Sequence, residues 1–189
     1  MVAARNASAT GWSSATVPAL LDALSARRAD PAGGAGAAMG VATAAALVAM
    51  CARFADRQRS DHAALADEAE HVQAKALELL EDDAVAFAPV LQVRRWGDSG
   101  ALEAALENAC RTPMAILEAA TRLAELGDAL ARTGNPRLAG DARAATCLAV
   151  GAGHAAAALI RENLGADADE PLMECAQAME ATLDAYRQG

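Results

Sequence analysis

The chain has 189 residues, which is enough for one domain with a substantial core. It is 54% hydrophobic but only 3% aromatic, and a core built mainly from Ala, Leu, Val and Met favours close-packed helices over a β-sandwich. The net charge is −9 and no dense run of Lys and Arg occurs, which argues against a nucleic-acid-binding surface.

The cysteines and histidines show no spacing typical of a metal site. The four cysteines, at positions 51, 110, 147 and 175, are far apart, and the three histidines do not pair with them. Residues 1–15 lack a continuous apolar segment, so we interpret them as a disordered leader and not a signal peptide. We expect a cytoplasmic protein with free thiols and a single helical domain over residues 16–189.

The first helix is predicted to begin at an N-cap, Thr16, with Pro18 tolerated in its opening turn, and to end near Arg28. A Gly-containing loop then leads into a helix over residues 35–57. Residues 32–52 carry no charge and could span a bilayer by length. Because Gly and Ala dominate this segment, a buried central helix is favoured over a membrane span.

The rest of the chain also has helical periodicity. A long helix is predicted from Asp61 to Arg95 with a kink at Pro89, and a short helix covers residues 101–110. The later helices are a segment capped by Thr112 with Pro113 at its first position and ending near Arg132, an Ala-rich segment over 138–164, and a last segment that starts near Asp169 or Pro171.

Two of these helices, 35–57 and 138–164, have small side chains of their own on nearly all sides. A helix that is apolar all round is buried, so we predict an all-α, up-and-down helical bundle with these two helices at its centre. If their outer faces are also apolar, self-association buries those faces. We therefore expect a homodimer.

Two carboxylates lie on otherwise apolar helical stripes. Asp83 shares a face with Leu80 and Phe87, and Asp141 is the first residue of a stripe along 138–164. An unpaired buried carboxylate is costly, so each requires a partner or a function. Simpler explanations stay open: Asp141 can favour a helix dipole, Asp83 can form a structural salt bridge, and His154 can be a core histidine bonded to a backbone carbonyl.

Several segments carry a family resemblance. The opening TVPALLDALSARRADPAGGAGAAMGVATAAALVAM resembles that of the formiminotetrahydrofolate cyclodeaminase / methenyltetrahydrofolate cyclohydrolase family. DDAVAFAPVL, ACRTPMAIL, GNPRLAGDARAA and IRENL are similar to later segments of that family and follow in the same order. The matches span about residues 16 to 165.

The resemblance implies a catalytic role for both carboxylates. Asp141 would act as general acid/base, and Asp83 would tune it or hold the pterin; both are expected to meet in one pocket beside the glycine turn. Arg95 would meet the glutamate carboxylate of a folate. The full set of substrate-binding residues implied is Pro31, Gly33, Gly34, Phe87, Arg95 and Asn135, and no metal or cofactor beyond the tetrahydrofolate substrate is expected.

The implied reaction is cyclisation of formiminotetrahydrofolate with loss of ammonia, or interconversion of methenyl- and formyltetrahydrofolate. The sequence departs from the family at Asp30 and Ala32 in the loop, at Gly140, and at Arg53. These departures leave two alternatives open: a non-catalytic helical dimer that binds folate or a partner, and an enzyme of the same fold acting on another amidine or imine.

Overall fold

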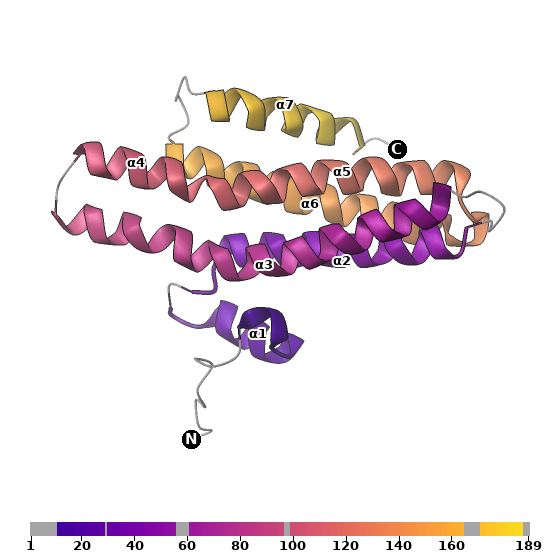
Figure 1. Ribbon diagram of the computed structural model, residues 1–189, viewed down its shortest axis with the longest axis horizontal. Helices are drawn as coiled ribbons and strands as arrows, with labels where there is room; N and C mark the ends of the chain where they lie inside the picture. The colour runs from indigo at the N-terminus through magenta and orange to yellow at the C-terminus, as the bar shows by residue number, and fades with distance from the viewer. Residues whose placement is uncertain (1–10, 29, 56–60, 97–98, 165–170, 187–189) are drawn as a thin grey trace.

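A computed structural model describes residues 11–28, 30–55, 61–96, 99–164 and 171–186. For residues 61, 83–87, 91, 94–96, 99 and 103 it describes the backbone only. Every regular element within these ranges is a helix, which confirms the all-α class. The elements, labelled in Figure 1, are η1 (Trp12–Ser14), α1 (Val17–Ser25), α2 (Gly33–Arg53), α3 (Asp61–Trp96), α4 (Ser99–Ala109), α5 (Arg111–Thr133), η2 (Pro136–Leu138), α6 (Ala139–Leu164) and α7 (Pro171–Ala185).

The cap predicted at the start of α1 is present, whereas the cap predicted at α5 is not. The Thr16 hydroxyl accepts a hydrogen bond from the Ala19 N–H at 3.4 Å, as expected of an N-cap. Thr112, however, is not a cap. Helix α5 already begins at Arg111, because the chain passes from α4 into α5 through Cys110 alone, and Thr112 is buried in the first turn.

The expectation of a disordered leader over residues 1–15 is wrong for its last part; residues 1–10 lie outside the described ranges. Trp12–Ser14 form η1, and the Ser13 N–H donates to Glu81 Oε1 on α3 at 2.6 Å. The Trp12 indole N–H donates to Asp30 Oδ2 at 3.3 Å, and the Arg28 guanidinium lies 5.1 Å from the ring centroid. The Ser13–Glu81 hydrogen bond joins η1 to α3, and the two Trp12 contacts join η1 to the segment that precedes α2.

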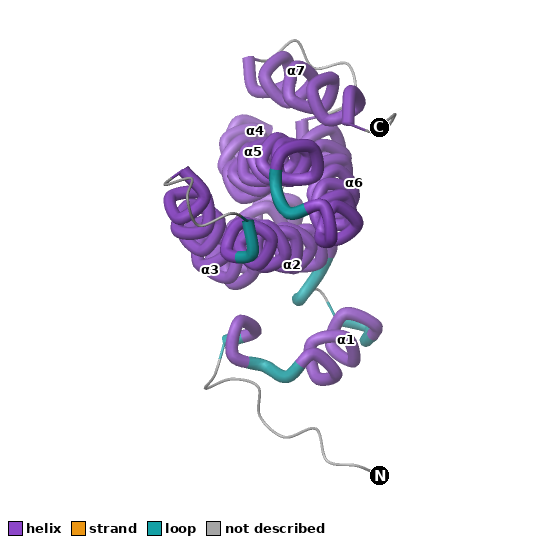
Figure 2. The backbone as a smooth tube through the Cα atoms, turned by 90° about the vertical axis from the view of Figure 1, so that its right-hand side faces the viewer, coloured by secondary structure: helices purple, strands orange, loops and turns teal. Residues whose placement is uncertain are grey.

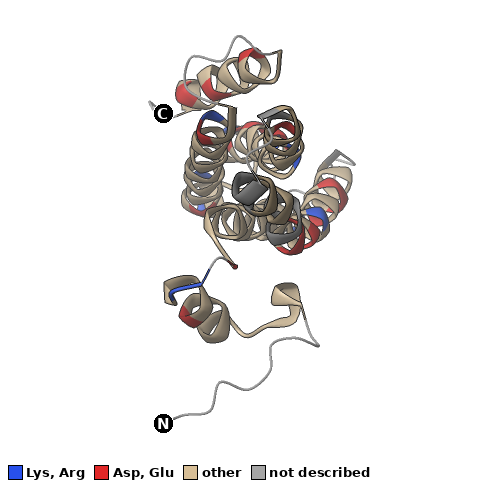
Figure 3. Cartoon of the chain, turned by 90° about the vertical axis from the view of Figure 1, so that its left-hand side faces the viewer, with Lys and Arg blue, Asp and Glu red and all other residues tan. Residues whose placement is uncertain are grey.

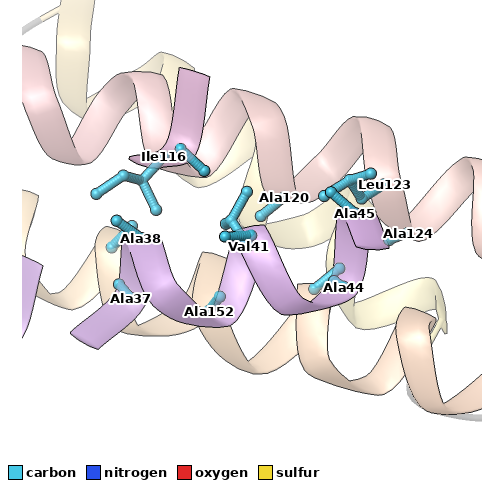
Figure 4. Close-up of a cluster of buried hydrophobic side chains, with 14 of the residues drawn as sticks. Ala37, Ala38, Val41, Ala44, Ala45, Ile116, Ala120, Leu123, Ala124 and Ala152 are labelled. Carbon is cyan, nitrogen blue, oxygen red and sulfur yellow. The ribbon is translucent and has the colours of Figure 1, made fainter. Parts of the chain in front are cut away.

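The core lies where α2, α5 and α6 pack together. In Figure 4, small side chains of α2 such as Ala38 and Ala45 pack around Val41 against Ile116 and Leu123 of α5. The alanines of α2 let the helix backbones approach closely, and α5 supplies larger side chains to the same core. Figures 1 and 2 show α7 beside α5 and α6, on the side that faces away from α2. They show α1 apart from the bundle, on the side of α2.

Helices α2 and α6 run antiparallel, side by side. A Cβ atom added at Gly33 would lie 3.4 Å from Leu159, and one added at Gly40 would lie 3.1 Å from Ala152. At the other end of α2, the Cys51 Sγ lies 3.9 Å from the Leu138 carbonyl oxygen. The start of α2 therefore faces the end of α6, and the end of α2 faces the start of α6.

Length and composition alone would allow Gly33–Arg53 and Pro136–Leu164 to cross a membrane. Of the most apolar window of each segment, 61% and 50% respectively is buried inside the fold. A buried core helix meets the same criteria, and the packing of α2 against α5 and α6 fits that description.

Candidate functional site

Asp141 lies in the first turn of α6, and its side chain is exposed. Burial raises the pKa of the nearby Cys51 thiol, and the charge of Asp141 raises it further. This electrostatic effect and the Cys51–Leu138 contact locate Asp141 beside the last turn of α2.

Asn135 connects the same two helix ends. Its side-chain N–H donates to the Phe54 carbonyl at 3.1 Å, and its side-chain oxygen accepts from the Arg137 N–H at 3.0 Å. Asn135 thus caps η2 and binds the residue that ends α2. The structure brings Asn135 and Asp141 together at one end of the α2–α6 pair.

The glycine turn lies at the opposite end of that pair. Pro31 and Gly34 are buried, whereas Gly33 is exposed beside Leu159. Gly33 and Cys51 are separated by about 27 Å along α2, from the helical rise per residue. The expectation that Asp141 lies beside the glycine turn is therefore wrong within one chain, because α2 and α6 are antiparallel.

The other expected site residues, Asp83, Phe87 and Arg95, lie on α3, and their side chains fall outside the described part of the structure. Their backbone positions are informative. An ion pair between Arg53 and Glu70 shows which residues of α2 and α3 lie level with each other. Asp83 lies about 20 Å further along α3 than Glu70, so its backbone is not level with Asp141 in the same chain.

A second cluster of ionisable groups joins α6 to α7, and sequence reasoning missed it. The His154 ring has Nδ1 3.1 Å from Glu180 Oε1 and Nε2 3.3 Å from Asp184 Oδ1, while Arg161 donates to Glu180 at 2.5 Å. His154 is therefore paired with carboxylates and not, as expected, with a backbone carbonyl. In Figure 3, α7 is marked by acidic residues and by no basic ones. These acidic residues are Glu174, Glu180 and Asp184.

Two cavities have linings that include neither Asp141 nor the glycine turn. One of about 650 Å³ lies between α5, α6 and the end of α7. The other, of about 530 Å³, is lined by residues of α3, α4 and α5 that include Lys75, Asp82 and Arg111. Within the described ranges, no group of three or more His, Cys, Asp or Glu side chains is arranged to hold a metal ion.

Comparison with known proteins identifies the family. The formiminotransferase-cyclodeaminase family model matches residues 16–183. The fold resembles the crystal structure of formiminotetrahydrofolate cyclodeaminase from Thermotoga maritima, with a TM-score of 0.81, 24% sequence identity, and coverage of 93% of this chain and 91% of that chain. A search of curated proteins finds no significant match. The chain belongs to the formiminotransferase-cyclodeaminase family.

Proposed function

We propose that the protein is a one-carbon folate enzyme that cyclises formiminotetrahydrofolate with release of ammonia, or interconverts methenyl- and formyltetrahydrofolate. The observation that carries this proposal is the family match over residues 16–183. The likeness of the fold to a protein named as a formiminotetrahydrofolate cyclodeaminase supports it.

In this proposal Asp141 is the general acid/base. Both reactions pass through a tetrahedral carbon and move protons on and off nitrogen, and a positioned carboxyl group contributes roughly 10²–10⁴ in rate to such a step. Asp141 lies in the first turn of α6, at the same end of the α2–α6 pair as Asn135. In a single chain, however, it is exposed, and a site for a folate requires further walls.

We propose that a second copy of the chain supplies those walls. Exposed and half-buried side chains form an uncharged stripe along each of α2 and α6: Gly36, Met39, Thr43, Ala46 and Met50 on α2, and Ala144, Leu148, Gly151, Ala155 and Ala158 on α6. A Cβ atom added at Gly36 or Gly151 would meet nothing within 4 Å, so packing within the chain does not require glycine at either position. Glycines on an outer face allow another backbone to approach closely.

A two-fold axis in this interface, at right angles to α2, makes the two α2 helices antiparallel. The stripes have their midpoints near Thr43 and Gly151, which lie at similar levels because Gly40 packs beside Ala152. In the proposed homodimer, the glycine turn of one copy would therefore lie level with Asp141 and Asn135 of the other, which one chain keeps apart.

The experiment follows methenyltetrahydrofolate by ultraviolet absorbance and ammonia release from formiminotetrahydrofolate. We expect turnover above the buffer rate with at least one substrate, and a loss of roughly 10²–10⁴ in kcat for Asp141→Asn. Asp67→Asn, which changes an exposed carboxylate on α3, is the matched control and should leave kcat unchanged.

One result would contradict the proposed activity, and another the proposed role of Asp141. Saturable binding of folate without turnover would favour the non-catalytic folate-binding dimer. Turnover that survives Asp141→Asn would remove Asp141 from the mechanism.

A further inference from the structure

The cavity between α5, α6 and the end of α7 lies on a different face of α6 from Ala144 and Leu148. Its volume of about 650 Å³ falls within the range of small-molecule sites. It is lined by Asp128, Ala131 and Arg132 of α5, by Arg143, Thr146 and Cys147 of α6, and by Ala185 and Tyr186 at the end of α7. The proposed folate site uses none of these residues.

The charges that line the cavity leave one cation unbalanced. Asp128, the acidic residue of the lining, forms an ion pair with Arg132. Glu125, whose charge also reaches Tyr186, is paired with Arg122 at 3.0 Å. Among the side chains that the structure describes, Arg143 forms no ion pair, so its guanidinium is available to an anion. Guanidinium groups bind carboxylates through two parallel hydrogen bonds.

The remaining walls suit an apolar, planar group. Ala131 and Ala185 contribute methyl groups, and the half-buried Tyr186 contributes a ring. The Thr146 hydroxyl donates to the Ala142 carbonyl at 3.1 Å, so its oxygen can still accept a hydrogen bond from a ligand. An aromatic ring packs favourably against another ring in an offset or edge-to-face arrangement.

We propose that this cavity binds a small carboxylate that carries a planar ring. The carboxylate binds Arg143, and the ring packs against Tyr186 and the alanine methyl groups. The proposal does not depend on the proposed activity, since it concerns a separate cavity and binding alone.

Tyr186 makes a site-specific test possible because it is the only tyrosine of the chain. In protein labelled with ¹³C-tyrosine, the ring resonances report on this cavity directly. We expect sodium benzoate to shift them in a saturable manner at constant ionic strength, and neutral benzyl alcohol to shift them far less. Arg143→Gln should weaken benzoate binding at least tenfold, whereas Arg137→Gln, an exposed arginine of η2 outside the cavity, should not.

Three results would overturn the proposal. The Tyr186 resonances could stay unchanged with benzoate, benzyl alcohol could bind as well as benzoate, or Arg143→Gln could bind benzoate with unchanged affinity. The second result would make the cavity apolar and not anion-selective, and the third would remove Arg143 from the site.

Discussion

At the scale of single residues, Glu180 shows how opposing effects combine. Partial burial alone would raise the pKa of its carboxyl group, but hydrogen bonds from Arg161 and His154 outweigh the burial and lower the pKa. The charged form of Glu180 is therefore favoured over the protonated form more strongly in the folded protein than in the unfolded chain. It stabilises the packing of α7 against α6 in its charged form.

This shift predicts a pH-dependent contribution to stability. Because the folded-state pKa lies below the ordinary value of about 4.3, the stabilisation is complete above that value and is lost as the pH falls through the folded-state pKa. We expect Glu180→Gln to cost about 1 kcal/mol near pH 7, and the cost to shrink below about pH 4. Thermal unfolding of both proteins from pH 7 to pH 3.5 checks this.

Glu174→Gln is the control, since Glu174 is exposed on the same helix. A cost for Glu180→Gln that stays constant over the whole pH range would show that the charge of Glu180 does not contribute to the stability.

At the scale of elements, the helices could be predicted because their signals are local. The Thr16 cap, the glycine and proline near residue 135, and the 3.6-residue periodicity all act within a few residues. The connection at Cys110 shows where local signals mislead. Cys110 alone joins α4 to α5, so Thr112, which was predicted as a cap, falls inside α5. The pairing of His154 with Glu180 was not predictable, since it joins residues of two helices and depends on how α7 packs.

Two glycines of these helices are expected to respond differently to alanine. A Cβ atom at Gly127 would lie 2.5 Å from the Thr146 Oγ1 and 3.1 Å from the Ala142 carbonyl, so α5 and α6 would have to separate. We expect Gly127→Ala to destabilise the protein by about 1–3 kcal/mol. At Gly140 the same atom would meet nothing within 4 Å, and Gly140→Ala should cost nothing.

Chemical denaturation of the two variants measures this difference. Equal stability of Gly127→Ala and Gly140→Ala would mean that α5 and α6 are less closely packed at Gly127 than the structure describes.

At the scale of the whole molecule, the sequence identified the family and the bundle but not the arrangement of the site. Family resemblance marked Gly33 and Asp141 as parts of one pocket, yet antiparallel packing puts them at opposite ends of the α2–α6 pair. No sequence pattern within one chain reports which residues a second copy brings near. The expectation of a homodimer came from the small side chains on nearly all sides of α2 and α6, since self-association would bury their outer faces if those are also apolar.

The most direct test of the account is complementation between two inactive variants. Asp141→Asn removes the proposed acid/base, and Gly33→Glu places a bulky anion in the glycine turn, where a helix N-terminus tolerates it. Each homodimer should be inactive. Heterodimers purified through two different tags should contain one intact site of two, and recover about half of the wild-type activity per dimer.

Leu148→Lys, which puts a charge in the proposed interface, should abolish the heterodimer, whereas Ala178→Lys on the exposed face of α7 should not. The measurement is folate turnover by the isolated Asp141→Asn/Gly33→Glu heterodimer. The account predicts recovery to about half of wild type. A heterodimer as inactive as its parents, or the absence of any such complex, would contradict a site shared between two copies.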